Sequence, residues 1–474
     1  MIAELLSSSL LGVWLTKAGH LQPPSPSGQD LSTMVLQSPD SDRDQVLKTY
    51  LNQLAQQGFD PARQAIWMQS DRGLLINHQG QQRQTPASLT KLATTLSLLK
   101  TLGAKHTFKT QIFGSGPVQL GSIQMGSVQM GSVQMGSVQM GSIQNGVLQG
   151  DLIVQGNGDP LLLTPELITI GNQLNQLGIR RVTGNLILQG AITINLSEDL
   201  SAAAGELREI WHSPSWGEAT RQAYASLPKN TPKPTLVIEG QTFTDGAGSS
   251  ISGSPLLTHT SVPLPEVLRL MNVYSSNAIA EWLAQLVGGA EVLNATALQT
   301  DQIAPKELAL TNGSGLGQDN KLSPRAAVGL LQAIQAELSP HGLTLADVLP
   351  VSGRDRGTVE KRTFPTAAVK TGTLWNTSGL AGVLTTQRYG RVWFAIMNDG
   401  DDYTDGFRNA QDTLLKKLAM QWGGVPKSET QKNKQPTDSQ QPTAIAPAPQ
   451  ALPPLYSSRY QALDRFMQQD FLTR

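Results

Sequence analysis

The residues most able to do chemistry fall in three short motifs that lie far apart in the chain. They are Ser88-Leu89-Thr90-Lys91, Ser275-Ser276-Asn277 and Lys370-Thr371-Gly372. A serine hydroxyl is a poor nucleophile at neutral pH, so a base must lie within hydrogen-bond reach of it. Lysine can be that base when partial burial and a second nearby cation destabilise its ammonium, and Lys370 is the candidate cation beside Lys91. The motifs therefore predict a serine acyl-transfer site without histidine.

The first motif is expected at the start of a helix. Thr85 suits the N-cap and Pro86 suits the first helical position, and leucines then recur at helical spacing up to Leu99. Ser88 and Lys91 are three residues apart, so they share one face of that helix. The positive end of the helix dipole would also favour the negative charge that develops during attack. Nucleophile and base are thus predicted to be neighbours.

The second motif needs a break in helical structure. Ser275 and Asn277 are two residues apart, a spacing that sends side chains to different faces of a continuous helix. Apolar residues at helical spacing predict one helix before the motif, from Val267 to Tyr274, and another after it, from Ala278 to Leu286. We therefore expect a loop that points a hydroxyl and an amide into the same site.

The third motif reads as an edge strand of an antiparallel sheet. It follows Ala367-Ala368-Val369 and precedes two strand-like runs, 380–386 and 392–397. An edge strand can pair with an extended peptide substrate, and a glycine lets the substrate backbone approach closely. The lysine of this motif would bind a carboxylate or tune the base.

With these motifs, the chain resembles the D-alanyl-D-alanine carboxypeptidase/endopeptidase family, the class C low-molecular-mass penicillin-binding proteins. The resemblance runs from about Val46 to about Trp422. Further blocks that carry it are Gln155-Gly156-Asn157-Gly158-Asp159-Pro160, Leu270-Met271-Asn272-Val273-Tyr274, Asn312-Gly313-Ser314-Gly315-Leu316, Leu322-Ser323-Pro324 and Leu349-Pro350-Val351-Ser352-Gly353. The segment 353–358 departs from the family pattern by an extra arginine, which we interpret as a loop insertion without catalytic meaning.

The resemblance implies an α+β fold: a penicillin-recognising serine transpeptidase/β-lactamase-like domain, with an antiparallel sheet and helices on both faces. It also implies that a D-Ala-D-Ala peptide of peptidoglycan acylates the serine, that the terminal D-alanine leaves, and that water hydrolyses the acyl-enzyme. β-Lactams would be inhibitors. The implied catalytic residues are Ser88, Lys91, Ser275, Asn277 and Lys370, and the implied substrate-binding residues are Thr371, Gly372 and Thr373.

In this scheme, which the resemblance supplies, Lys91 takes the proton from Ser88, and the backbone amides of Ser88 and Thr373 stabilise the oxyanion. Ser275 and Lys370 pass a proton to the departing amine. The side chain of Asn277 would bind the substrate amide, and Thr371 and Thr373 would bind its terminal carboxylate.

Composition narrows the choice of partners and cofactors. Lys plus Arg and Asp plus Glu are 36 each, so no net charge attracts nucleic acid or an anionic membrane. The chain has no cysteine, and its six histidines show no paired spacing. We therefore expect no metal and no cofactor. The stretch from Leu10 to Leu15 is apolar, but the region is a weak signal and too short for a stable membrane span. A periplasmic or extracytoplasmic location is inferred mainly from the expected substrate.

The strand and helix patterns predict a peptidase domain in two parts. Residues 42–106 and 255–424 would form it, after an N-terminal leader or arm, residues 1–41. An inserted β-rich domain would occupy residues 107–254 and contain a pentapeptide repeat at 121–145, which we interpret as an expanded hairpin tip or as a sticky patch. A Pro/Gln-rich linker, 425–454, and a tail, 455–474, either a short helix or frayed, would follow.

Two other functions share some of these features. A β-lactamase uses the same motifs but needs fast deacylation, usually with a dedicated glutamate or tyrosine, and the sequence does not place one. A non-catalytic peptidoglycan-binding or scaffold protein would have no use for a nucleophile beside two lysines. Carboxypeptidase and endopeptidase activity both cleave after a D-alanine, and the motifs fit either.

Overall fold

The computed structural model describes residues 41–115, 146–197, 199–244, 253–424 and 458–473. The predicted leader apart from Ser41, the pentapeptide repeat and the Pro/Gln-rich linker lie outside the described residues. Within the described ranges, no helix combines the length and apolar character that a membrane span requires.

The centre of the peptidase domain is one antiparallel sheet built from both ends of the chain. Its strand order is β13-β14-β15-β1-β2. Trp67 lies opposite Ala395, so the N-terminal hairpin pairs directly with the last C-terminal strand. The third motif lies on β13, at the sheet edge, as its sequence predicts. The strands are β1 (Ala65–Ser70), β2 (Gly73–His78), β13 (Ala367–Leu374), β14 (Thr377–Thr386) and β15 (Gly390–Asp399).

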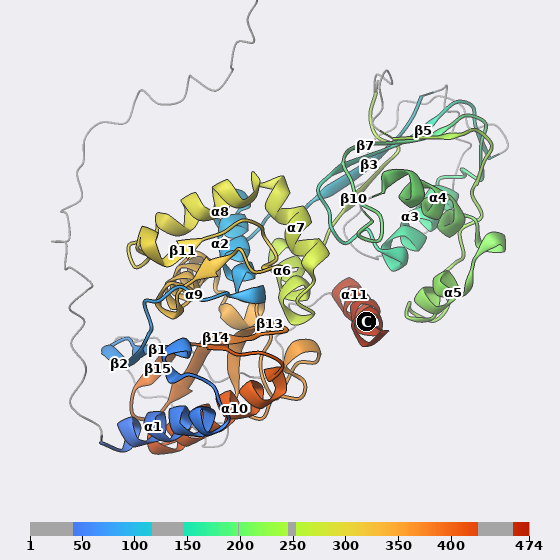
Figure 1. The fold of residues 1–474 in the computed structure, drawn as a ribbon. Coiled ribbons are helices and arrows are strands. Elements are labelled where there is room, and N and C mark those ends of the chain that lie inside the picture. Colours follow the sequence, from blue (N-terminus) through green and yellow to red (C-terminus); the bar gives the residue numbers. More distant parts are fainter. Residues whose placement is uncertain (1–40, 116–145, 198, 245–252, 425–457, 474) are drawn as a thin grey trace, which may run out of the picture. The chain divides into compact units, whose positions relative to one another are not determined.

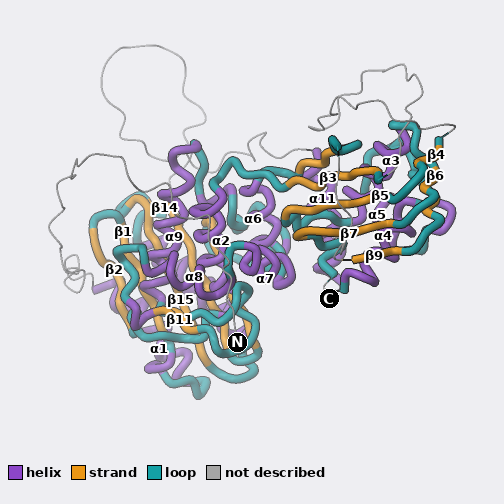
Figure 2. Tube along the Cα trace, turned by 90° about the horizontal axis from the view of Figure 1, so that it is seen from above, coloured by secondary structure: helices purple, strands orange, loops and turns teal. Residues whose placement is uncertain are grey.

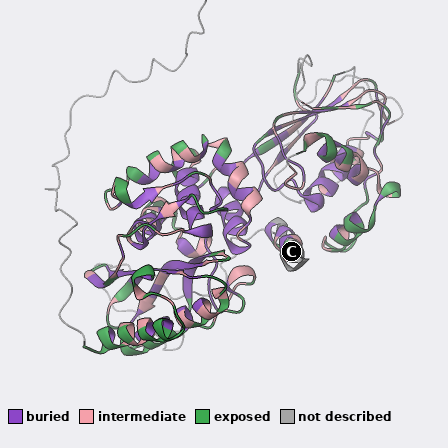
Figure 3. Cartoon of the chain, viewed as in Figure 1, coloured by how far each residue is buried: buried purple, intermediate pink, exposed green. Residues whose placement is uncertain are grey.

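Helices cover both faces of this sheet, with α1 and α10 on one face and α2 and α9 on the other (Figure 1). The helices on the two faces differ in exposure: α1 and α10 have exposed outer sides, whereas α2 is buried along most of its length (Figure 3). The helices are α1 (Ser41–Gln56), α2 (Lys91–Leu102), α6 (Leu264–Val273), α7 (Asn277–Leu286), α8 (Gly289–Leu298), α9 (Pro324–Leu338) and α10 (Thr404–Gln421). A two-stranded sheet of β11 (Leu308–Ala309) and β12 (Lys321–Leu322) completes this part.

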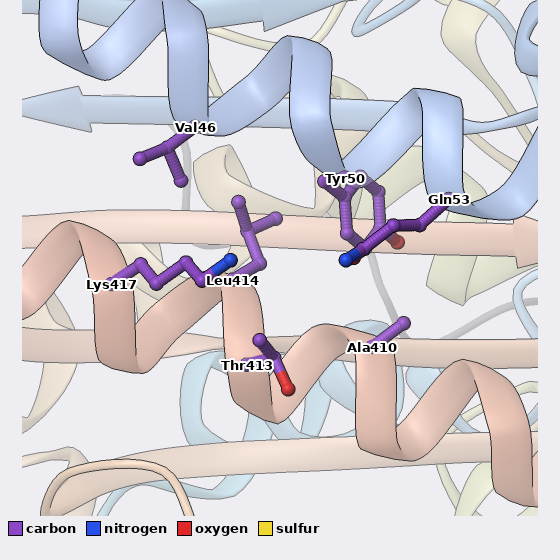
Figure 4. Close-up of a pocket in the computed structure, with 7 residues that line it drawn as sticks. All are labelled: Val46, Tyr50, Gln53, Ala410, Thr413, Leu414 and Lys417. Carbon is purple, nitrogen blue, oxygen red and sulfur yellow. The ribbon is translucent and has the colours of Figure 1, made fainter.

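Apolar periodicity explains the contact between the sheet and α10. Phe407, Leu414 and Leu418 recur at helical spacing and are buried in one core with Ile66 and Phe394 from the sheet. A small hollow remains between α1 and α10 (Figure 4), and no residue of the three motifs lines it. Its lining residues are Val46, Tyr50, Gln53, Ala410, Thr413, Leu414 and Lys417.

The inserted region is a mixed α/β unit, not the β-rich domain that the sequence predicts (Figure 2). Its main sheet has the order β10-β3-β5-β7-β9, in which β5, β7 and β9 run parallel. Parallel neighbours need crossover connections, and α3 and α4 lie in these connections. The strands are β3 (Lys109–Gly114), β5 (Leu152–Asn157), β7 (Leu186–Ala191), β9 (Thr242–Thr244) and β10 (Leu257–Thr260), and the helices are α3 (Thr164–Gln176), α4 (Leu200–Trp211) and α5 (Glu218–Ala225).

The inserted unit has a hydrophobic core of its own and extends past its predicted boundary. Leu167 and Trp211 from the helices meet Leu186 and Leu188 from the sheet in that core. Strand β10 pairs with β3, so the unit continues beyond residue 254, where the sequence analysis ended it. Three short parallel strands form a second sheet: β4 (Val147–Leu148), β6 (Arg181–Val182) and β8 (Val237–Ile238).

The end of the chain forms α11 (Ser458–Thr473), which contacts α3 and α6. Tyr460, Leu463 and Met467 of this helix are buried. The hydroxyl of Tyr274, at the end of α6, lies 2.8 Å from Asp464 Oδ1 and donates to that helix. The structure thus describes a packed terminal helix for this segment, rather than the frayed alternative.

Candidate active site

Ser88 lies in a 3₁₀ turn, Ala87–Thr90, that leads into α2. The predicted α-helical start at Thr85 and Pro86 is therefore wrong in detail. Thr85 does not cap the helix, and its hydroxyl accepts a hydrogen bond from Lys321 Nζ at 2.9 Å. Ala87 has a left-handed φ of +48°. Such strained backbone persists only where the surroundings hold it, and it is common beside reactive groups.

Lys91 is the first residue of α2 and is fully buried. Its Nζ has three partners: Ser88 Oγ at 2.9 Å, Asn277 Oδ1 at 2.8 Å and the backbone carbonyl oxygen of Ser314 at 2.8 Å. The amide and carbonyl oxygens can only accept hydrogen bonds, whereas the hydroxyl can accept or donate. A neutral amine here would use both hydrogens on the two oxygens, which leaves its lone pair for the proton of Ser88.

The second motif breaks the helical structure as the sequence predicts. Helix α6 ends at Val273, and Ser276 caps α7 by accepting a hydrogen bond from the Ile279 amide at 3.3 Å. Ser275 between them has a φ of +52°. Asn277 is the first residue of α7 and not part of the loop, so the helix itself directs its side chain to Lys91.

Lys370 projects from β13 and is also fully buried. Its Nζ donates to Ser275 Oγ at 2.9 Å and to the backbone carbonyl of Thr371 at 2.7 Å. The second and third motifs therefore meet directly, while the second meets the first through Asn277 and Lys91. The structure places the five predicted catalytic residues in two hydrogen-bonded groups, Ser88-Lys91-Asn277 and Ser275-Lys370, which the second motif joins through its backbone.

The predicted substrate-binding residues follow Lys370 along the edge strand. A Cβ on Gly372 would lie 2.5 Å from the Pro86 carbonyl oxygen and 3.2 Å from the Ser88 amide nitrogen, so only glycine lets β13 pass the serine this closely. Thr371 is buried, whereas Thr373 is exposed and its hydroxyl accepts a hydrogen bond from Arg408 Nη2 at 3.0 Å.

Burial is the main cause of the altered charge state of both lysines. It lowers the pKa of Lys91 to about 7, and the Glu281 carboxylate acts in the opposite direction. Burial also lowers the pKa of Lys370 well below its ordinary value, and the neighbouring Lys91 cation lowers that pKa further. The expected effect of the Lys370 cation on Lys91 is therefore not found: the pKa of Lys91 is shifted by burial and Glu281, and the lysine-lysine effect falls on Lys370.

Sequence reasoning assigned no role to Ser314 and Glu281. Ser314 lies in a quoted motif block, but only the fold shows that its carbonyl accepts a hydrogen bond from Lys91. Gly315, which follows with a φ of +81°, faces the Ala87 carbonyl so closely that a Cβ would lie 1.8 Å from its oxygen. The requirement for glycine there was the available signal that this loop passes beside the nucleophile.

Comparison with known proteins decides the family. A sequence model of the D-Ala-D-Ala carboxypeptidase 3 (S13) family matches residues 49–132, 135–203 and 222–420. The chain belongs to the S13 family. All three motifs lie inside the matched ranges, so the resemblance inferred from them is confirmed.

Several curated proteins are similar to this S13 chain. A D-alanyl-D-alanine carboxypeptidase from Actinomadura sp. is 24% identical over 438 residues, which cover 69% of this chain and 75% of that protein. A carboxypeptidase DacB from Mycolicibacterium smegmatis is 31% identical over 203 residues, which cover 39% of this chain and 43% of that protein. The chain thus spans less than half the length of this second relative.

Solved structures of similar fold support the architecture. A predatory endopeptidase from Bdellovibrio bacteriovorus, in complex with an immunity protein, has a TM-score of 0.62 at 19% identity, covering 78% of this chain and 96% of its own. Penicillin binding protein 4 (dacB) from Haemophilus influenzae has a TM-score of 0.56 at 18% identity, covering 79% of this chain and 99% of its own. These likenesses confirm the predicted fold class.

Two segments outside the three motifs contact the helices on either side of Ser275. The Trp282 indole on α7 donates to the Gly158 carbonyl at 2.9 Å, so a loop of the inserted unit holds the helix that presents Asn277. In the arginine-bearing segment that departs from the S13 pattern, the Thr358 hydroxyl donates to the Val273 carbonyl at 3.1 Å. Both contacts bear on the elements that flank Ser275.

Proposed function

We propose that this S13 protein is a serine-type D-Ala-D-Ala carboxypeptidase, with endopeptidase activity, that acts on peptidoglycan stem peptides through an acyl-enzyme on Ser88. The observation that carries the proposal is the arrangement around Lys91. This buried amine has two partners that can only accept hydrogen bonds and a third, Ser88 Oγ, that can give up a proton. With a pKa of about 7, Lys91 is substantially neutral at physiological pH.

Acylation follows from these contacts. The Lys91 lone pair takes the hydroxyl proton of Ser88, and Oγ forms a bond to the carbonyl carbon of the penultimate D-alanine. The amides of Ser88 and Thr373 would receive the oxyanion, and the close approach of Gly372 to the Ser88 amide supports that pairing. The charge on the carbonyl oxygen would thus develop beside these two backbone donors.

Collapse of the intermediate needs a proton for the leaving nitrogen. Ser275, 2.9 Å from Lys370 Nζ, would give its hydroxyl proton to that nitrogen and regain one from Lys370. The bond between the carbonyl carbon and nitrogen then breaks and releases the terminal D-alanine or, in an endopeptidase reaction, a cross-linked peptide. Deacylation reverses these roles, with water attacking the ester and Ser88 Oγ leaving with a proton.

Substrate binding would use the edge of β13 from Lys370 onward, because the first residues of the strand already pair with residues 350–352. An extended stem peptide can add there as a further strand, and Asn277 would hydrogen-bond its amide. Lys370, Thr371 and Thr373 would bind the terminal carboxylate. A substrate carboxylate beside Lys370 would also favour the charged form of this amine, which burial otherwise disfavours.

The names of relatives support the substrate class and the inhibitors. One Bdellovibrio bacteriovorus endopeptidase of similar fold is described both as acylated by penicillin G and as a peptidoglycan endopeptidase. We infer that β-lactams acylate Ser88 in the same way. Because peptidoglycan lies outside the inner membrane, the protein would act in the periplasm or another extracytoplasmic space.

The β-lactamase alternative requires a group that activates water quickly. The carboxylate that acts on Lys91 is Glu281, and its two oxygens accept backbone hydrogen bonds from Gly313 and Ser314. A carboxylate engaged in this way is a poor general base. A penicilloyl-enzyme that lasts hours favours the proposal, whereas turnover in milliseconds would favour the β-lactamase.

The deciding experiment measures free D-alanine after the full chain is incubated with a D-Ala-D-Ala pentapeptide. We expect release by the wild type and none by Ser88→Ala, which should also lose labelling by a fluorescent penicillin. Ser226→Ala is a matched control, because that hydroxyl only donates to Ala223 in the inserted unit. Stoichiometric labelling of Ser88→Ala would refute the nucleophile assignment.

A further inference from the structure

Glu281 lies beside the proposed base without touching the nucleophile. It follows Asn277 by one helical turn on α7, so both side chains project from the same face. The Oε1 atom of Glu281 accepts the Ser314 amide at 2.9 Å, and Oε2 accepts the Gly313 amide at 3.1 Å. A single carboxylate therefore holds two consecutive backbone groups of the loop that contacts Lys91.

That loop is held tightly between α2 and α7. The Thr94 hydroxyl on α2 donates to the Gly313 carbonyl at 2.7 Å. On the other side, a Cβ on Gly313 would lie 2.3 Å from Ala284 Cβ on α7. The loop therefore packs too closely for even a methyl group at Gly313. The Ser314 carbonyl in this loop accepts the hydrogen bond from Lys91.

We propose that Glu281 is a positioning residue for the acyl-transfer reaction: it orients the Ser314 carbonyl toward Lys91 and supplies the negative charge that lets Lys91 hold the proton it takes from Ser88. This inference rests on the proposed function, and it deepens it by naming what sets the strength of the base. Glu281 acts through the loop and through its charge, and it does not contact the reacting atoms.

Electrostatics explains why a carboxylate is useful at this position. Burial alone would make Lys91 a weak base, since the interior disfavours its charged form. A base whose pKa lies far below the working pH cannot hold the proton during the reaction. The charged groups that act on the lysine pair are Glu281 from α7, which raises the pKa of Lys91, and the Lys91 ammonium on α2, which lowers the pKa of Lys370 on β13. Glu281 is the negative member of this group, so it offsets part of the effect of burial.

The test compares two substitutions that separate charge from geometry. Glu281→Gln keeps the side-chain length but removes the charge and replaces one acceptor oxygen with an NH₂ group. Glu281→Asp keeps the charge but shortens the reach to the two amides. Glu291→Gln on α8 is the matched control, because that carboxylate is exposed and lies outside the loop and the motifs.

The measurement is the acylation rate constant with penicillin G, followed in the full-length protein from about pH 5.5 to pH 9.5. We expect Glu281→Gln to shift the rising limb of the rate profile to lower pH by about one pH unit. It should also lower the plateau rate about tenfold. Glu281→Asp should keep the limb near the wild-type position and lower only the plateau. Glu291→Gln should match the wild type.

A Glu281→Gln profile that superimposes on the wild type would overturn the inference. A purely structural contact would change how much protein folds, but it would not change the pH at which the acylation rate rises. If Glu281→Gln does not fold, the Asp variant decides: an unreduced plateau there would refute the positioning role. Failure of the proposed function looks different. In that case the wild type itself would neither release D-alanine nor accept penicillin on Ser88.

Discussion

The surroundings of Lys91 and of Lys370 differ in one respect that separates their tasks. Both amines are buried and both hydrogen-bond a serine hydroxyl at 2.9 Å. Lys91 has the Glu281 carboxylate to offset burial, whereas the charged neighbour that acts on Lys370 is the Lys91 cation, which adds to the effect of burial.

This difference assigns the two lysines to different partners. Lys91 has a pKa of about 7, so in the proposed mechanism it would exchange a proton with Ser88 near neutral pH. Burial and the Lys91 cation hold the pKa of Lys370 well below its ordinary value, so a bound anion would favour the charged form of this group. We infer that the anion is the carboxylate of the substrate. We therefore propose that two similar lysines serve as a base and as a carboxylate-binding group because their electrostatic neighbours differ.

The largest effect is expected from Lys91→Ala. Removing the base should lower the acylation rate about 10³-fold, in the range of general acid–base contributions. Stopped-flow reaction with a chromogenic β-lactam gives the rate, and circular dichroism checks the fold. A near-native rate in a folded variant would show that Lys91 is not the base, and the contrast with Lys370 would then fail.

Lys370→Ala is expected to lower kcat/KM about 10²-fold for peptides with a free terminal carboxylate, because it removes a charge-assisted contact. A peptide amide of the same sequence should lose less, since it lacks the anion and loses only the proton relay to Ser275. Measuring both substrates with both proteins sharpens the comparison. An equal loss on acid and amide would mean that Lys370 acts only through the relay and does not bind the carboxylate.

Asn277→Asp tests the electrostatic half of the comparison. A second carboxylate 2.8 Å from the amine would stabilise its cation, so the pKa of Lys91 rises. The neutral fraction at pH 7 then falls, and acylation there should slow about tenfold. The loss should be recovered above about pH 9. Asn277→Ala provides the uncharged control, and the rising limb of its acylation-rate profile should not move to higher pH.

Thr373→Ala should give the smallest change. Its hydroxyl is exposed and already accepts a hydrogen bond from Arg408, so its removal costs one polar contact to the substrate. We expect KM to rise about threefold to tenfold with kcat nearly unchanged. Steady-state assays on the pentapeptide check this, and a selective fall in kcat would place Thr373 in the chemical step.

The elements that follow from local side-chain pattern were predictable from sequence. The period of Phe407, Leu414 and Leu418 predicts α10, and the two apolar runs around Gly73 predict the β1–β2 hairpin. The break at Ser275 follows from its spacing to Asn277. In each case the residues that make the element are neighbours along the chain, so their periodicity records which face is buried.

The parts that were wrong depend on contacts between distant segments. Gly372 and Gly315 lie close to the backbone around the 3₁₀ turn at Ser88, and no residue near Ser88 in the sequence reveals these contacts. In the inserted unit, short apolar runs were interpreted as a β-rich domain, although Pro165 at the start of α3 was a visible helix signal. Glu281 had no local signature beyond its spacing of four from Asn277.

The central claim is that Ser88 is activated by a lysine that is neutral near physiological pH, and the pH dependence of wild-type acylation tests it most directly. Lys91 is inactive when protonated, so the single-turnover rate with penicillin G should be low under acidic conditions and rise through a midpoint near the Lys91 pKa of about 7. A midpoint close to 10.5, the ordinary value for lysine, or a rate independent of pH would contradict it.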